Sequence, residues 1–423
     1  MSTNSNLYYT NLIKIVAQRC ILFASYLLWT ILFARYYGPV ESKNFNLQIS
    51  SYGLLLILCG LSMETGFVYV TQKLNIRHNV IINSALVTAL IAGVIAALVA
   101  VIFKNSMYNF FNVALKPWHA FAYVFAWLFT GTCQYIYQIK QKILLFNIIV
   151  AVITLLLIGC LYYYPKMKEV GYYGNYHFSF LIGQAVVLFL VFLIFNKSKA
   201  TETFLNAIDF KKVLKFSITV FATNLVTFFM FKIDYFILEH YLNYHTNNVI
   251  PSYQQNQQNG NYNIASRLVQ TILTVTVIIA QTMFPEFALE KNRLLSYKRT
   301  NEIAKFVFIG FFTSCVLIAL CSKYIFTAIF GAGFNTMYKD FFYLIPGLIA
   351  QGVSGCFSAF LMGINNVKVV LHGCIIALVV ILIGDVIFIP KFGTLAAALV
   401  SSVGYTVQCF YSIYIINKQK LYQ

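Results

Sequence analysis

Five ionisable side chains lie inside long apolar stretches of this sequence, where a charge needs a partner, a water-filled surface or a function. They are three cations and two acids: Arg19, Lys232, Arg267, Asp234 and Glu64. A charge at the centre of a lipid bilayer costs about 3 kcal/mol on insertion scales, so such residues often mark binding or ion-transfer sites. We predict that the three cations bind an anionic ligand and that the two acids exchange a coupling ion.

The same charges also have a structural interpretation. Asp234 lies two residues from Lys232, and Arg267 lies on the next apolar stretch, so an ion pair could hold the two stretches together. Arg19 has no evident acidic partner at its depth, which favours a binding role for this residue. The excess of cations over acids at these positions favours a ligand with phosphate groups.

Polar residues recur at helical spacing beside these charges. Gln270 lies one turn from Arg267, Gln18 adjoins Arg19, and Gln351 begins a polar stripe on a later apolar stretch. A face of this kind does not point at lipid, because its polar groups would be left without hydrogen-bond partners. We predict that the three glutamines contact the ligand, with hydrogen bonds between helices as the alternative.

The stretches that hold these residues have the length of membrane spans. Of the 423 residues, 60% are hydrophobic and 10% are charged, whereas a soluble domain carries roughly 25% charged residues. Apolar runs of about 20 residues recur along the chain, which is the length of a helix that crosses a bilayer. We predict an all-α polytopic membrane protein with about 12 transmembrane helices in two pseudo-symmetric six-helix bundles. The expected spans are 11–34, 47–70, 80–103, 117–138, 143–163, 176–195, 214–239, 260–284, 303–321, 340–362, 367–389 and 393–416.

A duplicated motif divides the chain into two halves. Ile194–Lys199 ends the sixth expected span with a short basic segment, and Ile415–Lys420 ends the last span in the same way. Further matches in the same order indicate parallel repeats around a central cavity, the plan of an alternating-access transporter. We predict an N-terminal lobe at 1–199, a cytoplasmic linker at 200–213 and a C-terminal lobe at 214–423. A duplicated membrane scaffold without transport is the alternative.

Membrane topology explains most of the formal net charge of +18. Lys and Arg are concentrated in the loops that are cytoplasmic when both termini are cytoplasmic, and the external loop at 241–259 contains neither. We therefore expect both chain ends on the cytoplasmic side and the basic loops near anionic lipid. Because topology accounts for this charge, we expect no nucleic-acid partner.

Motifs for catalysis and for metal binding are missing from the sequence. It contains no P-loop, no GxSxG and no HExxH. The nine cysteines show no metal-ligand spacing and nearly all fall within apolar runs. We expect no enzymatic activity, no bound metal and no cofactor, with an H⁺ or Na⁺ gradient as the energy source.

Several motifs resemble the Wzx-type polysaccharide flippases of the multidrug/oligosaccharidyl-lipid/polysaccharide exporter superfamily. Phe33–Pro39 is similar to the end of the family's first helix. In the second half, Asp234–Leu238, then Gly260–Tyr262 and Ala265, are similar to a second family pattern. The chain departs from the family in lacking a glycine after the first loop and in its longer loop at 241–259.

This resemblance implies a transporter in a bacterial inner membrane. Its substrate would be undecaprenyl pyrophosphate carrying one oligosaccharide repeat unit of O-antigen (lipopolysaccharide) or capsule, flipped from the cytoplasmic to the outer face. It also implies a polysaccharide polymerase and chain-length machinery as pathway partners.

Two other functions stay open. A multidrug exporter of the same architecture would bind cationic drugs through buried carboxylates, which are scarce here. An O-antigen polymerase would carry catalytic Arg or His in a long external loop, and the loop at 241–259 has His245 but no Arg.

Overall fold

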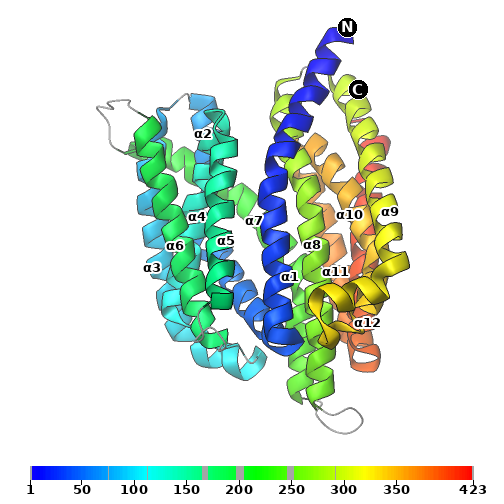
Figure 1. Cartoon of the computed structure of the whole chain (residues 1–423). Helices are drawn as coiled ribbons and strands as arrows, with labels where there is room; N and C mark the ends of the chain where they lie inside the picture. The colour runs from blue at the N-terminus through cyan, green and yellow to red at the C-terminus, as the bar shows by residue number, and fades with distance from the viewer. Residues whose placement is uncertain are drawn as a thin grey trace. The chain divides into compact units, whose positions relative to one another are not determined.

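Unbroken apolar runs produce an all-helical chain in the computed structural model (Figure 1). The structure describes residues 2–74, 76–111, 113–163, 170–196, 204–244, 252–290 and 292–421. Within these ranges, 10 helices are long and apolar enough to cross a membrane, and no strand is present. A helix satisfies its own backbone hydrogen bonds, which a spanning segment must do in lipid. The prediction of an all-α polytopic membrane protein is confirmed.

Most helices coincide with the expected spans. Those that match closely are α3 (His78–Phe111), α4 (Pro117–Ile139), α5 (Ile143–Tyr163), α6 (Val170–Phe195), α10 (Met337–Gly363), α11 (Val367–Phe392) and α12 (Thr394–Lys418). Local sequence sets several of these ends. Pro117 occupies the first turn of α4, where its missing N–H is not needed, and Gly393, with a positive φ of 59°, separates α11 from α12.

Three helices extend past their apolar runs at both ends. They are α7 (Ala207–Tyr244), α8 (Ser252–Leu289) and α9 (Arg293–Phe330). The Asn292 side chain starts α9 by accepting a hydrogen bond from the N–H of Leu295 at 3.1 Å. The loop expected at 241–259 is therefore shorter than predicted, because α7 and α8 continue into it. Residues 245–251, including His245, lie outside the described residues.

The region expected to be a loop between the first two spans is helical. Helix α1 (Ser2–Gly60) bends at Gly38, which has φ 77° and ψ 178°, and it continues as a helix through Pro39. Glycine is suited to this conformation because it has no Cβ. Polar residues after the bend are buried and stay helical; they include Ser42, Asn46 and Ser50. A break at Leu61 and Ser62, both with positive φ, then separates α1 from α2 (Met63–Leu74).

The helices form two compact units. Unit 1 consists of Met1–Lys43 and Val226–Gln423, and unit 2 consists of Asn44–Leu225. Helices α1 and α7 each continue from one unit into the other. The predicted lobes at 1–199 and 214–423 rest on a sequence duplication, which this grouping does not test, so they stay predictions.

In unit 1, α10 packs against α8, α9 and α12, and α11 packs against α12. A buried apolar cluster consists of Met230 of α7, Ala377 and Ile381 of α11, and Tyr405 of α12.

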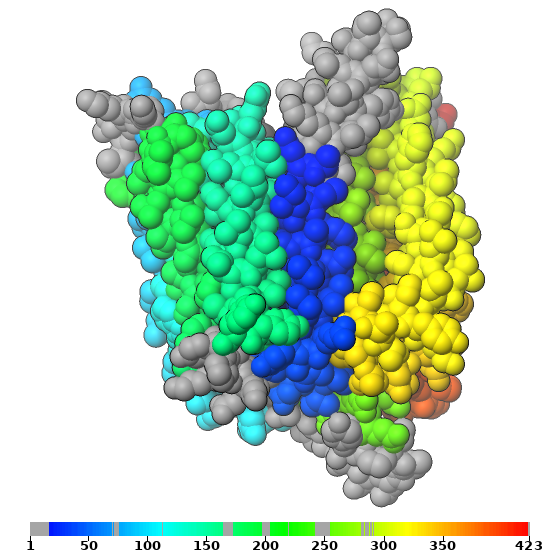
Figure 2. Space-filling model, in the orientation of Figure 1, coloured from blue at the N-terminus to red at the C-terminus, as the bar shows by residue number. Residues whose placement is uncertain are grey.

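The start of α1 and the end of α12 lie at the same end of unit 1 (Figure 1). Helix α9, yellow in Figure 2, carries large exposed apolar side chains, among them Leu317, which is 61% exposed, and Leu320, which is 77% exposed. Lipid is the solvent that suits such a surface.

In unit 2, α4 packs against α2, α3 and α6. At the start of α4, the His119 ring lies 4.4 Å from the ring of Phe178 of α6 at a tilt of 30°. The His119 Nε2 lies 2.7 Å from Oδ1 of Asn175. His119 is thus a buried polar group whose hydrogen bond joins α4 to α6.

Candidate functional site

Lys232 of α7 lies against Gln270 of α8, so the structure brings these two predicted site residues together. The Lys232 Nζ donates to Gln270 Oε1 at 2.6 Å. The same ammonium lies 4.7 Å from the centre of the Tyr235 ring, one turn further along α7. An amide oxygen and an aromatic face both stabilise a cation without neutralising its charge. A neutral amide and an aromatic face thus hold the Lys232 amino group within the helices of unit 1.

The side-chain amide of Gln270 is held by several acceptors. Its Nε2 is 3.2 Å from the Phe231 carbonyl oxygen, 3.4 Å from the Tyr235 hydroxyl and 3.4 Å from the Ser266 hydroxyl. Because the amide nitrogen faces these groups, the amide oxygen is left to accept from Lys232. Gln270 thus positions the ammonium of Lys232.

Arg267 lies one turn before Gln270 on α8 and stacks on an aromatic residue of α1. Its guanidinium carbon is 4.5 Å from the centre of the Trp29 ring. Trp29 in turn stacks on Phe33 at 5.2 Å, and both rings are buried. A planar guanidinium commonly stacks on an aromatic face in this way. We call Lys232, Gln270, Arg267 and Trp29 the cation cluster.

Asp234 does not form the ion pair with Lys232 that the sequence left open. Its Oδ1 accepts the Tyr235 N–H at 2.8 Å, and its Oδ2 accepts hydroxyl hydrogen bonds from Tyr262 and, at 3.4 Å, from Ser401. Residues two apart on a helix do not face each other, and the two charged groups attract each other without a direct ion pair. The structural ion-pair interpretation is wrong for this pair.

A second carboxyl group, which the sequence analysis did not select, lies near Asp234. Asp385 of α11 is 0% exposed, and neither of its carboxyl oxygens has a hydrogen-bond partner among the described residues. It interacts electrostatically with Asp234. The one sequence signal is an acid near the end of an apolar run, five residues before Pro390. We call Asp234, Asp385, Tyr262 and Ser401 the carboxyl cluster.

The other predicted ligand residues of unit 1 lie on α1 and α10. Arg19 is buried and Gln18 is half-buried. Arg19 lies ten positions before Trp29 on α1, a distance of about 15 Å along the helix axis. Gln351 of α10 is half-buried, and its Oε1 has no hydrogen-bond partner among the described residues. Whether any of the predicted residues binds a ligand stays a prediction.

Glu64 belongs to unit 2, so the structure does not place it in the carboxyl cluster. It lies in the first turn of α2, directly after the break at Leu61 and Ser62. The Ser62 hydroxyl accepts a hydrogen bond from Asn224 of α7 at 2.9 Å. A Cβ on Gly131 of α4 would lie 3.4 Å from the Glu64 Cγ, so α4 passes close to this carboxyl group.

The two clusters have opposite chemical preferences. Two cations and oriented amide and aromatic groups suit an anion, above all a phosphate, which accepts several charge-assisted hydrogen bonds. Two carboxyl groups with hydroxyl neighbours suit a proton or a small hard cation, which prefers oxygen ligands. Among the described residues, no group of three or more His, Cys, Asp and Glu is arranged to hold a metal ion.

A family model described as a polysaccharide biosynthesis protein matches residues 16–289. None of the curated protein sequences compared with the chain matches it.

The fold has close counterparts among solved structures. The chain is similar to an inward-facing multidrug resistance MATE family transporter of the MOP superfamily, with a TM-score of 0.73 and 13% identity over 96% of this chain and 98% of that chain. It is similar to the lipid II flippase MurJ in an inward closed conformation, with a TM-score of 0.69 and 16% identity over 97% and 89% of the chains. It is also similar to a mutant of the Vibrio cholerae MATE transporter VcmN, with a TM-score of 0.69 and 10% identity over 100% of both chains. At these identities the likeness establishes the fold.

Proposed function

The chain belongs to the polysaccharide biosynthesis protein family, and from this premise we propose that it flips a lipid-linked oligosaccharide across a bacterial inner membrane by alternating access. The substrate would be an oligosaccharide repeat unit on undecaprenyl pyrophosphate, moved from the cytoplasmic to the outer face. The observation that carries this proposal is the cation cluster, because it places Lys232 and Arg267 among membrane helices.

The cation cluster would bind the pyrophosphate. Lys232 supplies a compact charge, and Arg267 supplies a planar fork of N–H donors. Together these two side chains suit two neighbouring phosphate groups. Gln270 and Trp29 hold these cations in place before the ligand arrives, so less side-chain entropy is lost on binding. Arg19, Gln18 and Gln351 would contact the sugars or the second phosphate, while the lipid tail stays in the bilayer.

The carboxyl cluster would couple transport to an ion gradient. Asp234 and Asp385 cannot both carry an unbalanced charge inside the membrane at low cost. A proton or a sodium ion between them would neutralise the site, and its release would restore the repulsion. Asp234 is the primary coupling residue in this proposal, and Glu64 would act in unit 2.

The proposal is tested by the fate of the substrate. In cells without the protein, single repeat units linked to undecaprenyl pyrophosphate should accumulate on the cytoplasmic face. An Arg19→Ala variant that inserts normally should fail to relieve this accumulation. If the variant transports at the wild-type rate, Arg19 does not contact the substrate. If single units reach the outer face without the protein, it acts after flipping, as a polymerase does.

The second candidate function is a multidrug exporter. The buried pair Asp234 and Asp385 favours it, because buried carboxylates bind cationic drugs. Increased sensitivity of the deletion strain to cationic compounds, with surface polysaccharide intact, would support this function over flipping. A polysaccharide polymerase and chain-length machinery would be partners under flipping alone.

A further inference from the structure

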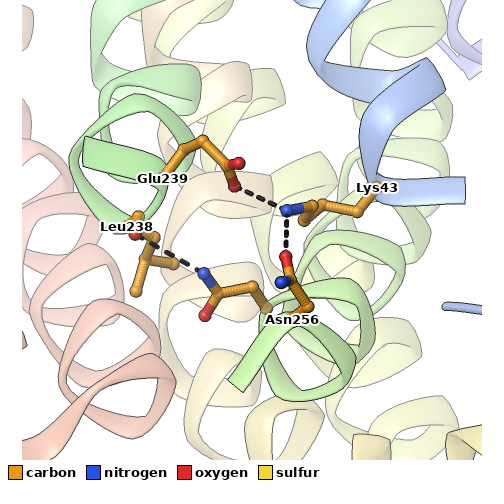
Figure 3. Close-up of polar contacts among 5 residues, drawn as sticks. Lys43, Leu238, Glu239 and Asn256 are labelled. Carbon is orange, nitrogen blue, oxygen red and sulfur yellow. Dashed lines mark hydrogen bonds and ion pairs between the residues drawn. The ribbon is translucent and has the colours of Figure 1, made fainter. Parts of the chain in front are cut away.

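A buried ion pair lies on helix α1 shortly after its bend at Gly38. The Lys43 Nζ is 2.7 Å from Glu239 Oε2 at the end of α7 and 2.7 Å from Asn256 Oδ1 near the start of α8 (Figure 3). The two charged side chains are 3% and 2% exposed. Replacing a buried ion pair by apolar residues is often neutral or stabilising, so such a pair is a weak source of stability. Stability alone therefore does not explain why this ion pair is buried here.

The turn of α1 that precedes Lys43 lies close to α8 and to the short 3-10 helix Ala332–Phe334 that follows α9. Gly260 of α8 faces the Pro39 carbonyl so closely that a Cβ there would clash with it. A Cβ on Gly333 would lie 3.0 Å from Pro39 Cδ. On the other side of the bend, Arg35 Nη1 donates to the Ala328 carbonyl at 3.0 Å, near the end of α9. The bent part of α1 is thus held by a backbone carbonyl, the Pro39 ring and one arginine side chain.

The surface on which this turn rests is polar. Gln257 Nε2 donates to the Gly333 carbonyl at 3.0 Å, and Asn261 Nδ2 donates to the Thr336 hydroxyl at 2.5 Å. Asn259 Nδ2 lies 3.5 Å from the Leu238 carbonyl. Polar contacts of this kind can be exchanged for contacts with water at little net cost, whereas buried apolar surface cannot. The geometry is that of a contact that can open and close.

Lys43 is the last residue of α1 that belongs to unit 1, and the helix continues into unit 2 from Asn44. The chain otherwise passes between the units within α7, after Leu225. An alternating-access cycle, on which this inference rests, requires the chain to deform near such crossings.

We propose that Lys43, Glu239 and Asn256 form a releasable latch that holds α1 on unit 1 and opens during each transport cycle. Opening would expose the buried turn to water, while the ion pair restores the same geometry on closing.

Labelling of a cysteine at position 42 tests this latch without any substrate. Ser42 is 0% exposed and its hydroxyl has no hydrogen-bond partner among the described residues, so Ser42→Cys preserves the packing. The neighbouring Glu41 is exposed, and Glu41→Cys is the matched control. The chain without an added cysteine, which has nine of its own, gives the blank. The reagent is a water-soluble maleimide applied to the reconstituted protein.

Two changes should move the labelling rate in opposite directions. Glu239→Gln leaves Lys43 without its counter-charge, so the latch opens more often and position 42 should react at least threefold faster. The apolar pair Lys43→Met with Glu239→Leu keeps the contact closed, so position 42 should react at least threefold slower and transport should fall at least tenfold. The control at position 41 should react at the same rate in every background. Asn256→Ala, which removes the neutral partner alone, should shift labelling in the direction of Glu239→Gln by a smaller factor.

The outcomes separate the latch from the proposed substrate. Equal labelling of position 42 in all folded variants, or wild-type transport by the apolar pair, would overturn the latch. Changed labelling in a protein that moves no lipid-linked oligosaccharide would support the latch and refute the proposed function.

Discussion

Lys232 offers the sharpest residue-level test of anion binding, because its partners are a neutral amide and an aromatic ring. Lys232→Gln should lower flipping at least tenfold, since one charge-assisted hydrogen bond contributes about 1.5–3 kcal/mol. The unfolding temperature should stay equal or rise, because the change removes a charge from a membrane helix. Flipping of a fluorescent lipid-linked oligosaccharide in proteoliposomes measures the first effect, and a thermal melt in detergent measures the second.

The matched control for this change is Lys305→Gln, which alters an exposed lysine of α9. It should leave flipping unchanged. Equal activity of the two glutamine variants would remove Lys232 from the binding site.

Asp385 provides the corresponding test of ion coupling. Asp385→Asn should make transport independent of the ion gradient, because the amide cannot bind and release a proton or a sodium ion. Stability should not fall, since neither Asp385 oxygen has a hydrogen-bond partner among the described residues. The control is Asp340→Asn in the same unit, a buried carboxyl group hydrogen-bonded to Thr394. The Asp340→Asn variant should be less stable, but its transport should still depend on the ion gradient. If transport by the Asp385→Asn variant also depends on the gradient, Asp385 is not part of the ion site.

The residues in the membrane were predictable from the sequence, but their partners were only partly so. Lys232, Asp234 and Arg267 stand out because charges are rare in apolar runs. The separation of two residues also argues against an ion pair between Lys232 and Asp234, because residues two apart lie on different faces of a helix. The approach of Asp385 to Asp234 joins α11 to α7, and only tertiary packing brings such distant segments together.

At the scale of the helix, close approach of backbones sets the packing of α10 against α12. A Cβ on Gly347 would lie 2.6 Å from the Ser402 Cα, and the Gly347 N–H donates to the Ser402 hydroxyl at 2.6 Å. Gly347→Ala should therefore destabilise the protein by about 1–3 kcal/mol, the usual cost of overpacking. The measurement is a thermal or denaturant melt in detergent.

Gly310 of α9 is the matched control, because a Cβ there meets nothing within 4 Å. Gly310→Ala should stabilise the helix by about 1 kcal/mol or less, from the higher helix propensity of alanine. If both alanine variants change stability by the same amount, the contact between α10 and α12 is not as tight as the structure shows.

Helix ends were harder to predict than helix positions. The apolar run of α5 defines both of its ends, whereas the first predicted span ends at residue 34 and α1 continues past its bend at Gly38 to Gly60. Ser42, Lys43 and Asn46 made the next segment look like a loop, yet these residues are buried in a helix. Hydropathy cannot separate a solvated loop from a helix whose polar groups bond to other helices.

At the scale of the molecule, the distribution of basic residues predicts how the chain lies in the membrane. The segment at 241–259 contains no Lys or Arg, while the segment at 285–305 and the C-terminal tail are basic. Each basic residue near an anionic membrane surface contributes about 1 kcal/mol of attraction, so the basic segments should stay on the cytoplasmic side. The start of α1 and the end of α12 lie at the same end of unit 1 (Figure 1), as an even number of spans requires.

Reporter fusions check this orientation directly. A fluorescent protein after the last residue should fold and fluoresce, because it stays in the cytoplasm. Alkaline phosphatase inserted near position 248 should be active, because it is exported. Moving four lysines into the 241–259 loop should reduce phosphatase activity at that site, since the added charges oppose its export. An active phosphatase at the C-terminus would reverse the orientation, and with it the side from which the cation cluster receives its ligand.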